Sequence, residues 1–219
     1  MDKTLSEQLE EYRAGWMQRV PAERRAKMER HIAHLVETGF GQRGKQVGDR
    51  APAIVLPDAY GRSFDVASLL KKGPVVVTFY RGGWCPYCNI ALRTYQAELV
   101  PALVTRGISL IAISPQTADG SLSSKETKEL TFTVLSDPGN QLARQLGILT
   151  APSEGVRQAQ LQIGLDLTQV NADGTTGLPM PTVIIADAAG TIRWIDVHRD
   201  YTTRTEPEQV LRAITQTIS

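Results

Sequence analysis

The sequence predicts an α/β domain preceded by a short helical extension. β-Branched residues run without a break through Val75–Phe79, as in a strand that is buried on both faces of a sheet. A second strand pattern at 108–113 follows a helical stretch, so the two runs form a β-α-β unit with an expected right-handed crossover. Two further apolar runs, 183–186 and 192–195, flank the turn sequence Asp187-Ala188-Ala189-Gly190 and predict a β-hairpin. With 219 residues, 42% of them hydrophobic, the chain can bury one domain and an appendage.

The beginning of the chain predicts two amphipathic helices. A helix is expected over 3–19, where apolar side chains recur at intervals of four, three and four residues, at Leu5, Leu9, Tyr12 and Trp16. Pro21 then opens a second helix that reaches about residue 37, and Gly39 stops it. The stretch 39–44 has the Gly-x-Gly-x-x-Gly spacing of a dinucleotide site, but a helix precedes it where that site needs a strand, so we interpret it as a flexible linker. We therefore divide the chain into a helical extension, 1–46, and an α/β domain, 47–219.

Shorter apolar runs bounded by turn residues predict the other elements of this domain. A strand at 54–56 and a helical turn at 66–70 come before the first long strand. The helix that begins near Pro86 continues towards residue 106, with Leu92, Tyr95 and Leu99 on one side. Then follow a helix at 120–130, a strand at 132–135, a helix at 139–146 and, after the hairpin, a final helix from Glu206. The polar stretch 150–178 carries little pattern and is interpreted as an insertion of uncertain structure.

The candidate active site is the sequence Trp84-Cys85-Pro86-Tyr87-Cys88, which follows two glycines at the end of the 75–79 strand. Proline is well suited to the first position of a helix, because its missing N–H would have no partner there. Cys85 is therefore expected at a helix N-terminus, where free amides and the helix dipole stabilise a thiolate. Cys88 lies one turn further on, near enough to close a disulfide with Cys85. The pair, which contains both cysteines of the chain, is predicted to be redox-active.

Two other interpretations of this pair carry less weight. A zinc site needs two more ligands, and His31, His34 and His198 are the only histidines in the sequence. A structural disulfide across so short a loop would remove little entropy from the unfolded chain. We therefore expect no metal and no other cofactor.

Composition argues against several classes of protein. A formal net charge of +1 gives no electrostatic reason to expect nucleic acid as a partner. The first residues lack the apolar core of a signal sequence, and no apolar stretch is long enough to span a membrane. Two cysteines at redox spacing, without a wider disulfide framework, suit a reducing compartment, so a cytoplasmic protein is expected.

The order of elements resembles the thioredoxin fold, and several sequence blocks narrow the resemblance. The segment Val47-Gly48-Asp49-Arg50-Ala51-Pro52, the strand into Phe79-Tyr80, the tripeptide Ser136-Asp137-Pro138 and the closing hairpin resemble the AhpC/TSA family, the peroxiredoxins. The resemblance covers 47–219, weakly at 150–178, and implies a thioredoxin-like fold of the peroxiredoxin type.

The active-site residues depart from the peroxiredoxin pattern. In the family register Cys88 occupies the position of the peroxide-attacking cysteine, and Cys85 replaces a threonine that contacts its thiolate. The family's arginine would fall near Met180, so its charge is absent there, and Arg81 is the candidate to replace it. The differences match a branch of peroxiredoxin-like proteins that have Cys-x-x-Cys.

Other features of the site resemble thioredoxin and glutaredoxin. Cys-Pro-Tyr-Cys is the glutaredoxin tetrapeptide, and Trp84 precedes it as in thioredoxins. Pro181 and Thr182, ahead of a strand, resemble the cis-proline segment that lies against the disulfide in those proteins. A cis Pro181 is therefore favoured over an ordinary trans proline at a strand start.

The resemblance implies a thiol-dependent oxidoreductase that reduces peroxides or disulfides, with a thioredoxin- or glutathione-type reductant restoring the dithiol. Helix geometry favours an exposed Cys85 of lower pKa as the nucleophile, with Cys88 resolving, whereas the family register favours the reverse. Trp84 and Tyr87 either shape the substrate surface or only pack, and Arg81 either lowers a thiolate pKa or is solvated. The alternative class is a non-enzymatic redox sensor or binding protein. A homodimer is slightly preferred, because the first helix has apolar surface to cover.

Overall fold

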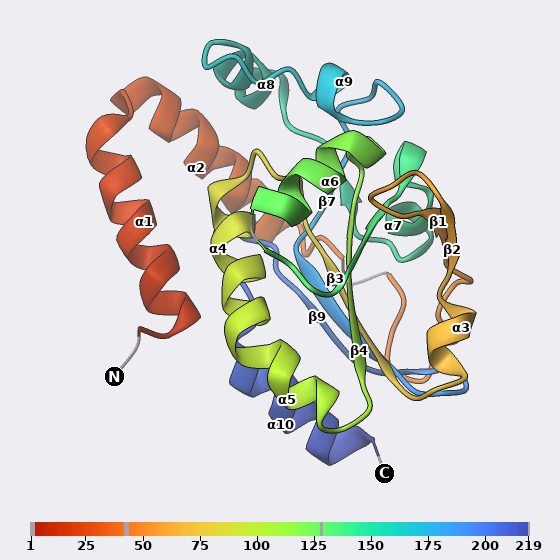
Figure 1. Ribbon diagram of the computed structural model, residues 1–219. Helices are drawn as coiled ribbons and strands as arrows, with labels where there is room; N and C mark the ends of the chain where they lie inside the picture. The colour runs from red at the N-terminus through yellow and green to blue at the C-terminus, as the bar shows by residue number, and fades with distance from the viewer. Residues whose placement is uncertain (1–2, 42–43, 128, 219) are drawn as a thin grey trace.

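A five-stranded sheet forms the centre of the computed structural model, which describes residues 3–41, 44–127 and 129–218 (Figure 1). The strand order is β5 (Thr133–Ser136), β4 (Ser109–Ser114), β3 (Val75–Phe79), β8 (Thr182–Ala186) and β9 (Ile192–Val197). β3, β4 and β5 are parallel, whereas β8 pairs antiparallel with both β3 and β9. The β-α-β unit and the hairpin are therefore confirmed.

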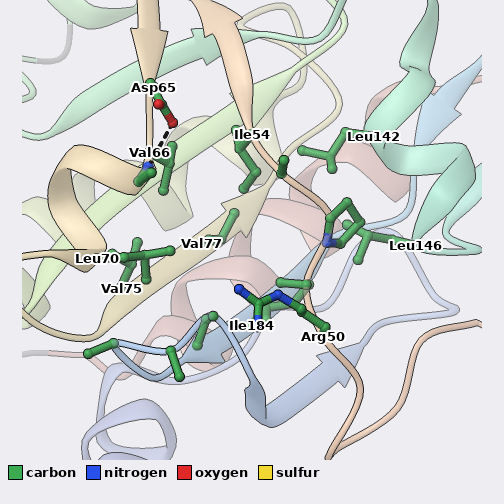
Figure 2. Close-up of a pocket in the computed structure, with 18 of the residues that line it drawn as sticks. Arg50, Ile54, Asp65, Val66, Leu70, Val75, Val77, Leu142, Leu146 and Ile184 are labelled. Carbon is green, nitrogen blue, oxygen red and sulfur yellow. Dashed lines mark hydrogen bonds between the residues drawn. The ribbon is translucent and has the colours of Figure 1, made fainter.

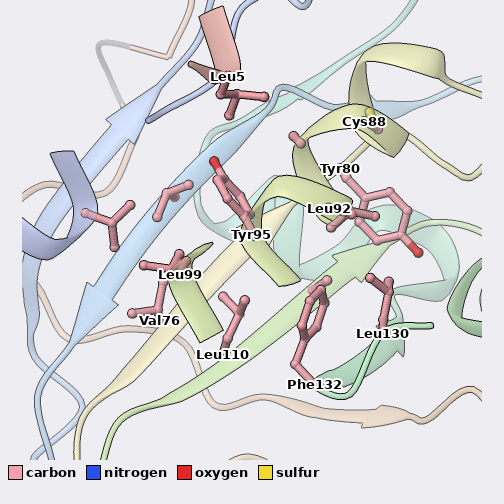
Figure 3. Close-up of a cluster of buried hydrophobic side chains, with 14 of the residues drawn as sticks. Leu5, Val76, Tyr80, Cys88, Leu92, Tyr95, Leu99, Leu110, Leu130 and Phe132 are labelled. Carbon is pink, nitrogen blue, oxygen red and sulfur yellow. The ribbon is translucent and has the colours of Figure 1, made fainter. Parts of the chain in front are cut away.

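Alternate residues of the central strands enter two different apolar clusters, because successive side chains point to opposite faces of a sheet. Val76 of β3 faces a cluster that includes residues of α4 (Pro86–Thr94), η1 (Tyr95–Leu99) and α10 (Pro207–Thr217). Figure 3 shows this cluster, with Leu5 and Cys88 among its members. Val75 and Val77 face the second cluster, which includes residues next to α3 (Ala67–Leu70) and in α7 (Gln141–Gln145).

The long helix expected after Pro86 is interrupted. Its middle, η1, is a π-helical stretch, and α5 (Val100–Val104) follows it. Pro101 lies in the first turn of α5 and has no N–H to continue the α-helical bonding pattern. The helix therefore lies where the sequence predicts it, but the sequence pattern does not indicate the change in its winding.

The helical extension consists of α1 (Leu5–Arg19) and α2 (Ala22–Glu37), as predicted. A capping box between Thr4 and Glu7 starts α1. Leu5 and Leu9 are buried in the first cluster, and the backbone N–H of Leu5 donates to the Glu206 carboxylate at 3.1 Å. Part of the apolar stripe of α1 thus packs against its own chain, and the homodimer stays a prediction.

Replacing Leu5 with alanine tests how firmly α1 is attached. The Leu5 side chain is completely buried, so the variant loses its transfer free energy and leaves a cavity. We expect the free energy of unfolding to fall by about 2 to 4 kcal/mol. Denaturant melts of both proteins measure this, and Glu10→Ala, at an exposed position of the same helix, is the control. A loss below about 0.5 kcal/mol would mean that α1 is not docked as described.

The remaining elements are two short strand pairs and several short helices. β1 (Val55–Pro57) pairs with β2 (Ser63–Asp65), and β6 (Leu149–Thr150) pairs with β7 (Leu178–Pro179). α6 (Ala118–Thr127) follows β4, and the short η2 (Pro138–Asn140) leads into α7. The stretch of uncertain structure contains α8 (Glu154–Leu161) and α9 (Leu167–Val170), and α8 contacts α2. Part of the predicted linker, residues 42 and 43, lies outside the described residues. Among those that are described, no helix combines the length and apolar content needed to cross a bilayer.

Candidate active site

The two cysteines lie where β3 turns into α4. The turn depends on Gly82. Its φ of 147° is disfavoured for other residues, and the Trp84 indole packs so close to its Cα that a Cβ would clash with it. Cys85 is the N-cap of α4 and Pro86 its first residue, as the sequence predicted. The side chain of Gln116 accepts a hydrogen bond from the Gly83 backbone N–H and ties the turn to the segment after β4.

Both cysteines are free thiols and both are buried. They come within 3.1 Å of each other. Cys85 is only 1% exposed, so the prediction of an exposed thiol at the helix N-terminus is wrong. The helical extension and the loop between β9 and α10, which carries Tyr201, cover this turn. The ring of Tyr87 makes an edge contact with the ring of Tyr12 of α1, at 5.1 Å between centroids, and another with the ring of Tyr201, at 6.5 Å.

Arg204 is a site residue that the sequence analysis missed. Its Nη2 donates a hydrogen bond to Cys88 Sγ at 2.8 Å, and its Nη1 donates to the backbone carbonyls of Tyr201 and Thr203, both at 2.6 Å. Arg204 is 7% exposed, and among the described residues no carboxylate lies within ion-pair distance of it. A buried guanidinium needs a counter-charge, and the Cys88 sulfur is the group in position to supply one.

The surroundings set the pKa values of the two thiols in opposite directions. Burial and the neighbouring Cys88 sulfur raise the pKa of Cys85 well above its ordinary value. Burial alone would also raise the pKa of Cys88, but a hydrogen bond from Cys85 and the charge of Arg204 hold it well below its ordinary value. This is the reverse of the prediction that Cys85 has the lower pKa, because burial and the neighbouring sulfur dominate at Cys85, whereas the Cys85 hydrogen bond and the Arg204 charge dominate at Cys88.

An arginine reaches the site from a position other than the two that the sequence suggested. Met180 is buried and carries no charge, as predicted, but Arg204 reaches the sulfur from the loop between β9 and α10. Arg81 also contacts this sulfur through its backbone, because its N–H donates a hydrogen bond to Cys88 Sγ at 3.4 Å. A lone arginine in a polar loop gives no periodic pattern, so only the three-dimensional structure identifies Arg204 as a site residue.

A small polar network holds the loop that carries Arg204. Thr205 donates from its hydroxyl to the Asp196 carboxylate at 2.8 Å, and a ring nitrogen of His198 lies 3.1 Å from the same carboxylate. The Thr205 carbonyl accepts from the Tyr95 hydroxyl at 2.7 Å. Burial would raise the pKa of Asp196, but its hydrogen bond and charge interaction with His198 lower it. Asp196 and His198 are therefore positioning residues for the loop.

The aromatic residues beside the cysteines enclose Arg81. Its guanidinium lies over the Tyr201 ring at 4.0 Å and over the Trp84 ring at 5.2 Å. Arg81 is 6% exposed, so the alternative of a solvated loop arginine is wrong. Its charge lowers the pKa of both thiols, although burial acts more strongly on each.

Pro181 and Thr182 lie at the end of the sheet from which the cysteine turn leaves, since Thr182 is paired with Phe79. All peptide bonds between described residues are trans, so the prediction of a cis Pro181 is wrong. In the trans form the Pro181 carbonyl accepts from the His198 backbone N–H at 2.9 Å, and the Thr182 hydroxyl donates to the Met180 carbonyl at 2.9 Å. The first of these bonds continues the β8–β9 pairing, whereas the second is local to the segment before β8.

Two cavities differ in what they offer chemically. The larger, 340 Å³, lies against the second apolar cluster (Figure 2), and its described lining residues include neither cysteine nor histidine. The other, 190 Å³, is lined by Cys85 together with Arg81, Trp84 and Tyr201. Within the described part of the chain, no group of three or more His, Cys, Asp or Glu side chains is placed to hold a metal ion. The reactive groups of the site are thus the two sulfurs.

Comparison with known proteins places these features in a family context. The model of the AhpC/TSA family matches residues 47–195. A protein of Mycobacterium tuberculosis named as a peroxiredoxin is 31% identical over 100 residues, which cover 46% of this chain and 62% of the relative. The thiol-disulfide oxidoreductase ResA of Bacillus anthracis is 28% identical over 109 residues, 49% of this chain and 61% of ResA. The chain therefore matches less than two thirds of the length of these relatives.

Solved structures agree on the fold. Peroxidoxin BcpB from Mycobacterium tuberculosis superposes with a TM-score of 0.61 at 19% identity, over 80% of this chain and 99% of BcpB. A peroxiredoxin-like protein from Aquifex aeolicus gives a TM-score of 0.62 at 16% identity, over 80% of this chain and 89% of that protein. The thioredoxin-like fold of the peroxiredoxin type, with an N-terminal helical extension, is thereby confirmed.

Proposed function

The chain belongs to the AhpC/TSA family, and on that premise we propose that it is an oxidoreductase that reduces peroxides with the Cys85–Cys88 dithiol. The observation that carries the proposal is the buried contact between Arg204 and Cys88 Sγ. A cation held at a sulfur favours the thiolate, and the thiolate is the form of cysteine that attacks an O–O bond.

The proposed reaction uses both sulfurs and a single proton held between them. The Cys88 thiolate attacks the terminal oxygen of a hydroperoxide, the O–O bond breaks, and Cys88 becomes a sulfenic acid. The Cys85 thiol gives its proton to the departing alkoxide, which leaves as an alcohol. The Cys85 thiolate so formed attacks the Cys88 sulfur, and the S–S bond forms as hydroxide leaves. An external thiol reductant of the thioredoxin or glutathione type then restores the dithiol. Cys88 thus takes the attacking role, which the family register favours and helix geometry alone does not.

Disulfide exchange is a second candidate, supported by the likeness to ResA and by the Cys-Pro-Tyr-Cys sequence. The burial of both sulfurs favours a small peroxide over a bulky disulfide as oxidant, because a protein disulfide cannot approach a thiol that is 1% exposed. A cytoplasmic location, where thiols are kept reduced, and a homodimer stay predictions.

A turnover assay tests the proposed function. The reduced protein is mixed with a hydroperoxide or with a small model disulfide, with either a thioredoxin system or glutathione as reductant, and consumption of reductant is followed. We expect steady consumption with the hydroperoxide. Consumption with the disulfide alone would identify an exchange enzyme, and a single stoichiometric oxidation would identify a redox sensor instead.

A further inference from the structure

The helical extension lies over the cysteine turn. In Figure 1 α1 runs alongside α4, and contacts join α1 to α4 and α2 to α8. Arg13 of α1 forms an ion pair with Asp200 at 3.6 Å, and the Tyr201 hydroxyl lies 3.8 Å from the Met28 sulfur of α2. The two helices are thus attached to the loop that also supplies Arg204.

Between these helices and the cysteine turn lies the 190 Å³ cavity. The helical extension contributes Tyr12, Trp16, Met28 and Ile32 to its lining, and the cysteine turn contributes Trp84 and Cys85. Most of this lining is aromatic or aliphatic. The cavity reaches Cys85, and Cys88, which is buried behind it, lies within 3.1 Å of Cys85, so a small molecule in the cavity lies next to the dithiol.

We infer that this cavity is the substrate pocket and that α1 and α2 make the site selective for compact apolar organic hydroperoxides. The inference rests on the proposed function. Both helices precede the segment matched by the family model, so the selectivity comes from a part of the chain that the model does not include.

Size and polarity together define the substrate class. Pockets for drug-sized ligands usually exceed about 300 Å³, so a cavity of this size takes only a smaller molecule. A water molecule takes up about 30 Å³, so hydrogen peroxide would leave most of the apolar wall without contact. A branched alkyl group of a few carbons covers that wall and removes apolar surface from water, whereas most of a long acyl chain would lie outside a cavity of this size.

Oxidation rates with probes of different size test the inference. The reduced full-length protein is mixed in a stopped-flow instrument with hydrogen peroxide, tert-butyl hydroperoxide or linoleic acid hydroperoxide, and the second-order rate constants are compared. We expect tert-butyl hydroperoxide to react at least about tenfold faster than either of the other two.

Two variants should change this preference in opposite directions. Trp16→Ala enlarges the pocket and should raise the rate with linoleic acid hydroperoxide about tenfold relative to hydrogen peroxide. Ile32→Phe narrows the pocket and should lower the rate with tert-butyl hydroperoxide about tenfold while sparing hydrogen peroxide. Gln18→Ala, at an exposed position of α1 outside the lining, is the matched control and should leave all three rates unchanged.

The results separate this inference from the proposed function. If the wild-type protein reduces all three peroxides at similar rates and neither pocket variant changes the ratios, the selective pocket is wrong and the peroxidase survives. If no peroxide oxidises the dithiol, the proposed function itself is wrong. Circular dichroism and thermal melts of each variant show whether it is folded. Because the two substitutions change the pocket volume in opposite directions, either one alone can contradict the inference if the other unfolds.

Discussion

Replacing Cys88 with serine is expected to lower the rate of reaction with a hydroperoxide by at least about a thousandfold. A serine hydroxyl is not ionised near neutral pH, so the Arg204 guanidinium would lie beside a weak nucleophile. Cys85→Ser should behave differently: Cys88 still attacks, but with no resolving thiol the reaction stops at the sulfenic acid after one turnover. Stopped-flow oxidation and dimedone labelling followed by peptide mass analysis measure both effects.

The two serine variants are each other's control, because each removes one sulfur from the same buried turn. Dimedone on Cys88 in Cys85→Ser, with Cys88→Ser unreactive, is the expected pattern. The opposite pattern, with Cys85 labelled and Cys85→Ser inert, would make Cys85 the attacking residue. Thermal melts of both variants show that the comparison is made between folded proteins.

Arg204→Met is expected to lower the rate of oxidation at pH 7 on the order of a hundredfold and to make it rise again with pH. The direction of this pH effect follows from the fraction of Cys88 that is present as thiolate. In the wild-type protein the pKa of Cys88 is held well below its ordinary value, so the rate should be level across neutral pH and fall only on acidification. Without the guanidinium, less positive charge counters the effect of burial, so the pKa of Cys88 rises. A more alkaline solution is then needed to form the thiolate.

Two further substitutions separate charge from shape. Arg204→Lys keeps the positive charge and should recover part of the rate at pH 7, although it loses the planar fork that also binds the Tyr201 and Thr203 carbonyls. Arg199→Met, in the same loop, removes a hydrogen bond to the Phe40 carbonyl and should leave the pH profile unchanged. A flat profile in Arg204→Met at the wild-type rate would show that this arginine does not set the thiolate.

Local sequence patterns predicted most of the fold. The unbroken β-branched run of β3 and the closing hairpin identified strands because these patterns depend on neighbouring residues alone. The positions of Cys85 and Pro86 at the start of α4 followed from helix-capping rules in the same way. The spacing of apolar residues does not indicate the π-helical turn at η1, which directly precedes α5 and its Pro101, a residue without an N–H for the α-helical bonding pattern.

The site itself depends on long-range contacts, which local patterns do not contain. Cys85 was expected to be exposed because its own helix leaves it open, and Tyr12 of a distant helix covers that turn. Arg204 is separated from Cys88 by 116 positions, so no spacing rule connects them. Pro181 lies in a trans segment whose carbonyl accepts from the His198 backbone N–H, just after β9, a partner that its own neighbours in the sequence do not indicate. In each case a feature that the local sequence left open was decided by tertiary packing.

The most direct test of the account is to give the reduced protein one equivalent of tert-butyl hydroperoxide, block any remaining thiols with an alkylating reagent, and analyse unreduced peptides by mass spectrometry. We predict a disulfide between Cys85 and Cys88, no alkylated cysteine and one equivalent of tert-butanol. Recovery of both cysteines as alkylated thiols, or of an over-oxidised Cys88 next to an alkylated Cys85, would contradict the proposal that the two sulfurs work as one dithiol.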